Sequence, residues 1–267
     1  MGKSMIRIFR VSSQACRKAI CDKSRALLGL LSLTILLPVG AAAQATEIIP
    51  DPVFHQRGSV LYWQHCVACH GANGDGNGPQ AELFVPRPRD FTVGNFKFRT
   101  SGLGEYPTRE DLIRAIDHGG AIGAEAGIPS FDQLNLMDRT ALAEAVRIFA
   151  QIPEYPETFV VPPRSLGVDI KKGQALFVEN GCIDCHGPKG DGKGVLASEL
   201  TDSRGFKATP ANLTLGRFKG GNASENIWMR IYAGIDGSPM PSFGHNLSVQ
   251  DIWSLVDYVE NFRQKKE

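Results

Sequence analysis

The sequence predicts an all-α protein that contains two similar domains in tandem. The segment CVACHGANGDGNG, which begins at Cys66, recurs as CIDCHGPKGDGKG from Cys182, 116 residues later. Apolar residues recur at helical spacing, and no segment shows the alternation of a half-buried strand. A length of 267 residues and a hydrophobic content of 42% suit one or two globular domains.

The first 45 residues have the features of a secretory signal peptide. A leader with seven Lys and Arg residues precedes the apolar run 26–37, and small residues follow at 41–45. The apolar run is shorter than the roughly 20 residues that a membrane-spanning helix needs. We expect cleavage near Ala43–Ala45 and a periplasmic product with no membrane span in its mature form. An uncleaved amphipathic anchor is the alternative.

Removal of this leader changes the charge balance of the protein. Seven basic residues and one acidic residue leave with it, so 22 basic and 27 acidic side chains remain, a formal balance of −5. Proteins that bind nucleic acid need a basic face, so this balance argues against a nucleic-acid partner.

The repeat extends downstream of the cysteine motifs and defines the domains. Residues 88–97 (PRDFTVGNFK) align with residues 210–219 (PANLTLGRFK), and the IPSF segment at 128–131 aligns with MPSF at 240–243. Four prolines between 152 and 163 indicate a short stiff linker. We therefore predict a first domain at 46–151, a linker at 152–166 and a second domain at 167–267.

The expected helices follow in the same order in both domains. One helix enters each motif, at 58–65 and 173–180. A Thr108-x-x-Asp111 box begins a shorter helix that carries Leu112, Ala115 and Ile116. Each domain ends in an amphipathic helix, the second of which begins with a Ser248-x-x-Asp251 box. The apolar faces of these final helices consist of Leu142, Ala145, Val146 and Phe149, and of Ile252, Leu255, Val256 and Val259.

Each C-x-x-C-H motif predicts covalent attachment of haem. A redox dithiol needs an α/β scaffold that lowers a thiol pKa, and no βαβ pattern surrounds these cysteines. Structural zinc needs four close ligands, and each motif supplies three. Haem attachment needs two thiols on one helical turn and an adjacent histidine, which is what C-x-x-C-H supplies. A buried porphyrin also gives a small domain an apolar centre.

The second axial ligand of each iron differs between the domains. Met240 lies between Pro239 and Pro241, and its thioether suits haem iron, although methionine more often only packs. The aligned residue of the first domain is Ile128, which cannot bind iron. His118 and Met137 are the candidates there, and an open site, water or another residue is the remaining possibility.

These residues resemble those of a tandem di-haem protein of the class I c-type cytochromes, across residues 55–263. The two motifs, the GSPMPSF loop and the final amphipathic helix carry the resemblance. The resemblance implies two covalently bound haem c groups, with thioether links at Cys66, Cys69, Cys182 and Cys185. It also implies proximal ligands His70 and His186 and distal ligand Met240.

The leading functional hypothesis is a periplasmic di-haem cytochrome that carries or relays single electrons between respiratory redox partners. One alternative is a haem enzyme or a gas- or peroxide-binding protein, in which an open first haem receives electrons from the second. Another is the haem subunit of a larger respiratory oxidoreductase complex. We assign no catalytic residue, and the oligomeric state stays open.

Overall fold

The structure is a computed structural model that describes residues 48–84, 86–117, 129–165, 167–218 and 220–264. Ala45–Glu267 form one compact unit. The described secondary structure is helical, and its only β-contact is an isolated bridge between Thr201 and Lys207. The all-α prediction is therefore confirmed. The predicted signal peptide lies outside the described residues, among which no helix has the length and apolarity to cross a membrane.

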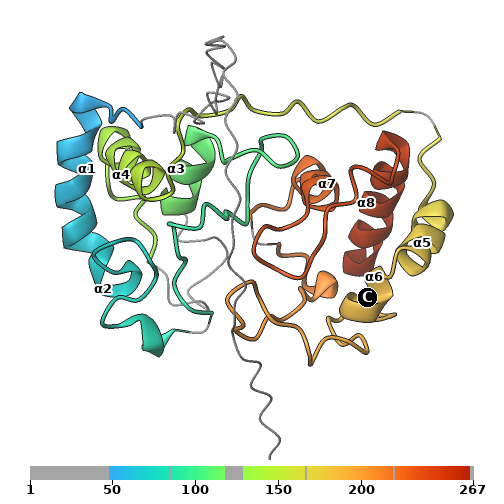
Figure 1. Ribbon diagram of the computed structural model, residues 1–267. Helices are drawn as coiled ribbons and strands as arrows, with labels where there is room; N and C mark the ends of the chain where they lie inside the picture. The colour runs from blue at the N-terminus through green and yellow to red at the C-terminus, as the bar shows by residue number, and fades with distance from the viewer. Residues whose placement is uncertain (1–47, 85, 118–128, 166, 219, 265–267) are drawn as a thin grey trace, which may run out of the picture. The chain divides into compact units, whose positions relative to one another are not determined.

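The described residues of the first half form three longer helices and two short ones (Figure 1). They are α1 (Pro52–His65), α2 (Val67–His70), the 3-10 helix η1 (Ala81–Leu83), α3 (Arg109–Asp117) and α4 (Leu136–Phe149). The last of these, α4, packs against both α1 and α3. The short helix α2 carries Cys69 and His70 of the first cysteine motif, and Cys66 is its N-cap.

The second half repeats this order. It contains α5 (Ile170–Glu179), α6 (Cys182–His186), the 3-10 helix η3 (Leu213–Leu215), α7 (Ser224–Ala233) and α8 (Val249–Gln264). The final helix α8 packs against α5, α7 and η3. Each half is thus organised around contacts of its final helix with the helix that enters the cysteine motif.

Short polar side chains fix the beginnings of several helices. The side chains of Asp51, Asn135 and Asp169 each accept a hydrogen bond from a backbone N–H in the first turn of α1, α4 and α5. Thr108 and Asp111 cap α3 reciprocally, with distances of 3.0 and 3.1 Å. This is the predicted capping box. The helix α1 begins earlier than predicted, because Asp51 caps it and Pro52 suits a first helical position.

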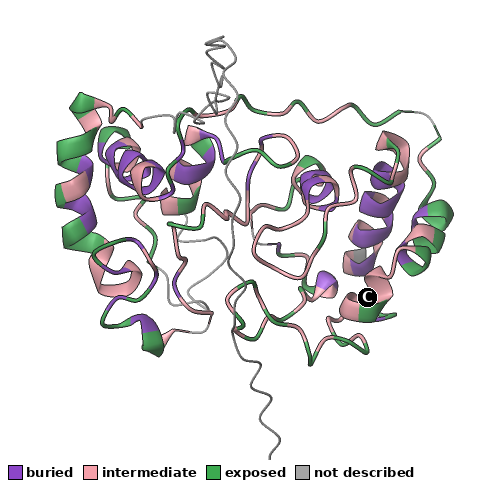
Figure 2. Cartoon of the chain, in the orientation of Figure 1, coloured by how far each residue is buried: buried purple, intermediate pink, exposed green. Residues whose placement is uncertain are grey.

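The predicted apolar faces of the final helices form the core. Leu142, Ala145 and Val146 are buried in the first half. Phe149, the fourth residue of that predicted face, is half-buried. All four residues of the predicted face of α8 are buried, namely Ile252, Leu255, Val256 and Val259. Figure 2 shows these buried positions as purple stretches on α4 and α8. The predicted helix after Thr108 is α3, which carries the buried Leu112 and the exposed Ala115.

A glycine lies where the first and last helices of each half cross. A Cβ atom on Gly58 of α1 would lie 2.1 Å from the carbonyl oxygen of Ala141 in α4. A Cβ atom on Gly173 of α5 would lie 2.0 Å from the carbonyl oxygen of Ser254 in α8. Both distances are far below van der Waals contact, so only glycine permits the helix backbones to approach this closely.

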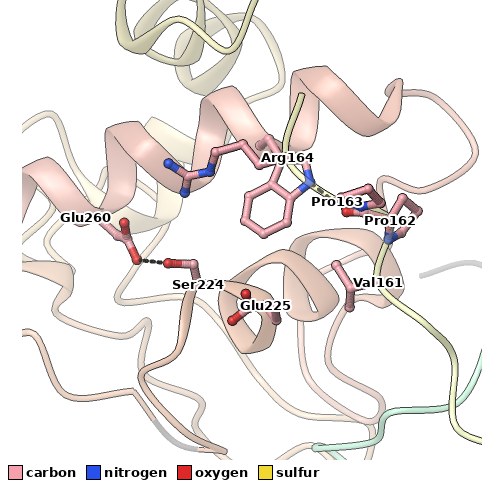
Figure 3. Close-up of a pocket in the computed structure, with 8 residues that line it drawn as sticks. Val161, Pro162, Pro163, Arg164, Ser224, Glu225 and Glu260 are labelled. Atoms are coloured by element: carbon pink, nitrogen blue, oxygen red, sulfur yellow. Dashed lines mark hydrogen bonds between the residues drawn. The ribbon is translucent and has the colours of Figure 1, made fainter. Parts of the chain in front are cut away.

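The proline-rich linker packs against the second half. The Phe159 ring stacks on Tyr232 with centroids 5.0 Å apart, and the Trp253 indole N–H donates to the carbonyl of Pro162 at 3.0 Å. Arg164 lies over the Trp253 ring. Figure 3 shows the cavity of about 440 Å³ that the linker borders together with α7 and α8. The linker therefore contributes apolar side chains to the second core.

The substitution Gly173→Ala tests the close crossing of α5 and α8. The added methyl group collides with the Ser254 carbonyl, a backbone atom that cannot move alone, so the helices must separate. Overpacking costs about 1–3 kcal/mol, and a collision with a backbone atom belongs at the upper end of that range, above the roughly 1 kcal/mol that alanine gains over glycine in a helix. We expect a lower free energy of unfolding in denaturant titrations. The adjacent exposed residue provides the control, because Gln174→Ala should have almost no effect.

Candidate haem-binding sites

Each cysteine motif lies on one short helical turn that follows directly from a longer helix. In the first half, the amide of His70 donates to the carbonyl of Cys66 at 2.8 Å, which holds both cysteines and the histidine on the same turn. Cys182 and His186 are the first and last residues of α6. All four cysteines are free and half-buried. The predicted residues of each motif therefore come together, with two unpaired thiols beside one imidazole.

A backbone carbonyl orients each motif histidine. The Nδ1 atom of His70 lies 2.9 Å from the carbonyl oxygen of Arg89, and the Nδ1 atom of His186 lies 3.1 Å from that of Ala211. A carbonyl oxygen can only accept, so Nδ1 carries the proton and donates. In a neutral ring Nε2 is then the unprotonated nitrogen, which is the atom able to bind a metal.

The same two histidines are biased towards the neutral form. Burial lowers the pKa of His70 and of His186 from its ordinary value, and the bond to the carbonyl only partly opposes this. A neutral imidazole with a free Nε2 is the form in which histidine binds iron. In both halves, burial and the bond to a carbonyl thus favour a neutral imidazole whose Nε2 can bind a metal.

The segments that contain Arg89 and Ala211, whose carbonyls accept from the motif histidines, are hydrogen-bonded to the glycine-rich loop after each motif. The amide of Phe91 donates to the carbonyl of Gly74, and the amide of Leu213 donates to that of Gly190, both at 2.7 Å. Gly74 and Gly190 have φ values of 72° and 67°, a region that favours glycine. The repeated GDG-x-G frame therefore places the backbone that holds each histidine.

The final helix of each half also contacts this loop. A Cβ atom on Gly74 would lie 2.7 Å from the Phe149 ring of α4, and one on Gly190 would lie 2.8 Å from the Phe262 ring of α8. The glycines thus serve two purposes, a left-handed turn and a close approach to an aromatic ring. The motif, its loop and the final helix form one packed arrangement in each half.

Burial raises the pKa of the motif thiols. The thiol pKa of Cys66 rises to about 12 and that of Cys182 to about 11. A redox-active dithiol requires the opposite shift, because the thiolate is the reactive species. The electrostatics of these sites therefore do not favour thiol–disulfide exchange, which agrees with the choice of haem attachment over a redox dithiol.

Met240 lies in a loop that hydrogen bonds to itself and borders the second core. The amide of Ile235 donates to the Met240 carbonyl at 3.1 Å, and the Met240 amide donates to the Ser238 hydroxyl at 3.3 Å. Met240 and Cys182 pack against the same cluster of buried side chains. This placement is compatible with a thioether held close to a cofactor bound at the second motif.

The first half contains no described residue in an equivalent position. Ile128 and His118 lie outside the described residues. Met137 lies in the first turn of α4 and is 60% exposed, unlike the half-buried Met240. The identity of the distal ligand in the first half therefore stays a prediction with its alternatives open.

The sequence motifs did not identify Arg89 and Ala211, whose carbonyls hold the histidines. A carbonyl oxygen belongs to every residue, so the residue type carries no signal. The hint that the sequence contains is their place in the aligned segments 88–97 and 210–219, where each follows a proline. Because the donor set is two free thiols and a neutral imidazole with an available Nε2, the residues of both motifs fit a covalently attached haem.

Comparison with known proteins agrees with this fit. The family model for cytochrome c matches residues 55–144 and 170–263. A chain of the Kuenenia stuttgartiensis reducing HAO-like protein complex Kustc0457/Kustc0458 is 33% identical, with a TM-score of 0.71 over 81% of this chain and 97% of that chain. No curated protein gives a significant match. Since the two family matches together span more than half of the residues, the chain belongs to the cytochrome c family and contains two cytochrome c domains.

Proposed function

We propose that this protein is an exported di-haem c-type cytochrome that relays single electrons between respiratory redox partners. The observation that carries the proposal is the duplicated arrangement of two free thiols beside a histidine whose Nδ1 donates to a backbone carbonyl. In this proposal Cys66, Cys69, Cys182 and Cys185 form the thioether links. His70 and His186 are the proximal ligands, and Met240 is the distal ligand of the second iron.

Haem c supplies a one-electron couple between ferrous and ferric iron. The protein residues have to keep the ligands in place in both oxidation states. The carbonyls of Arg89 and Ala211 fix the orientation of the two imidazole rings, and Pro239 and Pro241 restrict the loop that carries Met240. Little reorganisation is then needed when the charge of the site changes.

The partner is proposed to be another redox protein, in a free encounter or in a stable assembly. The similar structure belongs to a reducing HAO-like protein complex, which supports a role as a subunit of a larger assembly. The predicted signal peptide supports a periplasmic location for either form. Co-purification of a second polypeptide with the tagged protein, stable at high salt, would support the subunit form.

A second candidate function is ligand binding or catalysis at the first haem. Ile128 occupies the position that aligns with Met240, and it cannot bind iron. If no other residue replaces it, the first iron can bind nitric oxide, carbon monoxide or peroxide. Addition of carbon monoxide to the reduced protein separates the two functions, because a prompt Soret shift in half of the haem indicates an open site. No shift supports the electron carrier.

The first test concerns haem attachment. The double substitution Cys182→Ala, Cys185→Ala removes both thiols of the second motif and leaves the first motif intact. We expect the mature chain, made with a working cytochrome-maturation system, to retain one covalent haem where the unsubstituted chain has two. Intact-mass spectrometry after denaturation measures this directly. The reciprocal change of Cys66 and Cys69 is the control, and an unsubstituted chain with no added mass contradicts the proposal.

The second test concerns Met240 as an iron ligand. A Met/His pair raises the reduction potential of a haem relative to ligation by nitrogen or water. We therefore expect Met240→Leu to lower the potential of one of the two haems in a spectroelectrochemical titration. The matched control is Met229→Leu, which makes the same chemical change at a buried core methionine of α7. Unchanged potentials in Met240→Leu contradict the assignment.

A further inference from the structure

The second domain contains a turn that the first domain lacks. His186 and Pro210 are 24 residues apart, whereas the aligned His70 and Pro88 are 18 residues apart. The six additional residues lie between Glu199 and Pro210, where residues 201–207 form a turn that we term the inserted turn. It follows the motif loop of the second domain and precedes the segment that holds His186. The turn also contacts the loop that carries Met240, because the amide of Ser203 donates to the carbonyl of Gly237 at 3.2 Å.

The inserted turn is fixed internally by hydrogen bonds. Thr201 and Lys207 form an isolated antiparallel bridge, and the amide of Asp202 donates to the carbonyl of Phe206 at 2.7 Å. The Asp202 carboxylate accepts from the amides of Arg204 and Phe206 at 2.9 and 3.0 Å. The turn is therefore a defined support for the Arg204 side chain at its tip.

Arg204 contacts the backbone of the first domain. Its Nη1 donates to the carbonyl of the buried residue Pro88 at 2.7 Å, and its Nη2 donates to the side-chain oxygen of Asn77 at 3.4 Å. The Arg204 guanidinium lies over the Phe206 ring, with its Cζ atom 5.1 Å from the ring centroid. Arg87 of the first domain lies over the same ring at 5.4 Å.

The contacted carbonyl is next to the one that holds His70. Pro88 accepts from Arg204, and Arg89 accepts from Nδ1 of His70. Two consecutive carbonyls of the first domain thus have different partners, Arg204 of the second domain for Pro88 and His70 of the first domain for Arg89. A displacement of the Pro88 carbonyl changes the direction of the Arg89 carbonyl, and with it the orientation of the imidazole ring.

A second contact joins the first domain to the loop that carries Met240. Asp236 accepts from Nε and Nη2 of Arg99 at 2.9 and 3.3 Å, and the Arg99 side chain is only 5% exposed. A Cβ atom on Gly237 would lie 3.0 Å from Nη1 of Arg89. The segment that holds His70 therefore lies against the loop that leads to Met240, so the two candidate iron sites share one interface.

We propose that Arg204 is a positioning residue for the first haem site. From the second domain, its side chain holds the Pro88–Arg89 backbone, and the Arg89 carbonyl orients His70. The inference rests on the proposed ligation of the first iron by His70. It assigns a function to the inserted turn and makes the first site dependent on the second domain. An isolated first domain would lack this support.

The test uses the mature holoprotein with both haems attached, as verified by intact mass. Low-temperature electron paramagnetic resonance of the oxidised protein reports the axial ligand geometry of each iron, and Met240→Leu identifies which signal belongs to the second haem. We expect both Arg204→Ala and Arg204→Lys to shift the g values of the first haem. The lysine variant keeps the charge but lacks the planar group that contacts Pro88 and Asn77 together.

The matched control is Arg263→Ala. Like Arg204, Arg263 donates to a backbone carbonyl and lies over a phenylalanine ring, but both partners, Asn222 and Phe218, belong to the second domain. It should leave the first haem signal unchanged. Unaltered first-haem signals in both Arg204 variants overturn the proposal. A shift in Arg204→Ala alone also overturns it, since charge rather than position is then the cause. If Arg204→Ala does not accumulate, Arg204→Lys decides.

Failure of this proposal is distinct from failure of the proposed function. A chain without haem at the first motif contradicts the proposed function before any Arg204 variant is made. Fully loaded Arg204 variants with unaltered first-haem spectra contradict only the positioning role.

Discussion

The hydrogen bond between a motif histidine and a backbone carbonyl is the interaction on which each site depends. It determines which ring nitrogen carries the proton and therefore which nitrogen faces a metal. The carbonyl lies 19 residues from His70 and 25 residues from His186 along the chain. The intervening glycine loop has to return to the motif to place it, and the contacts of Gly74 and Gly190 with the final helices hold this loop.

The two domains share this arrangement but differ in their cores. The second core contains large aromatic rings, among them Trp228, Trp253 and Phe262. Among the described residues, the first core consists of two clusters that contain Leu61, Tyr62 and small residues of α4. The linker increases the difference, because Phe159 packs on the second core. Duplication has therefore preserved the backbone that surrounds each histidine, while the side chains that support it have diverged.

The two domains are joined by polar contacts through loops. Arg99 with Asp236 and Arg204 with the Pro88 carbonyl connect segments that each lie next to a candidate iron ligand. Burial lowers the pKa of the nearby Arg89 guanidinium, and the charge of Arg204 adds to this shift. The carboxylates of Asp202 and Asp236, also from the second domain, oppose it. In a relay protein such an interface keeps two redox sites in a constant relation.

The sequence by itself determined the all-α class, the repeat and the motif residues, because helical periodicity and C-x-x-C-H spacing are local properties of the chain. The capping residues Thr108 and Asp111 and the apolar face of α8 were predictable for the same reason. Only the tertiary structure decided which carbonyls hold the histidines, since a carbonyl has no sequence signature. It also decided that Gly58 and Gly173 lie at helix crossings and that Arg204 reaches Pro88. Those contacts join residues far apart in sequence, and their energy depends on packing that no local pattern encodes.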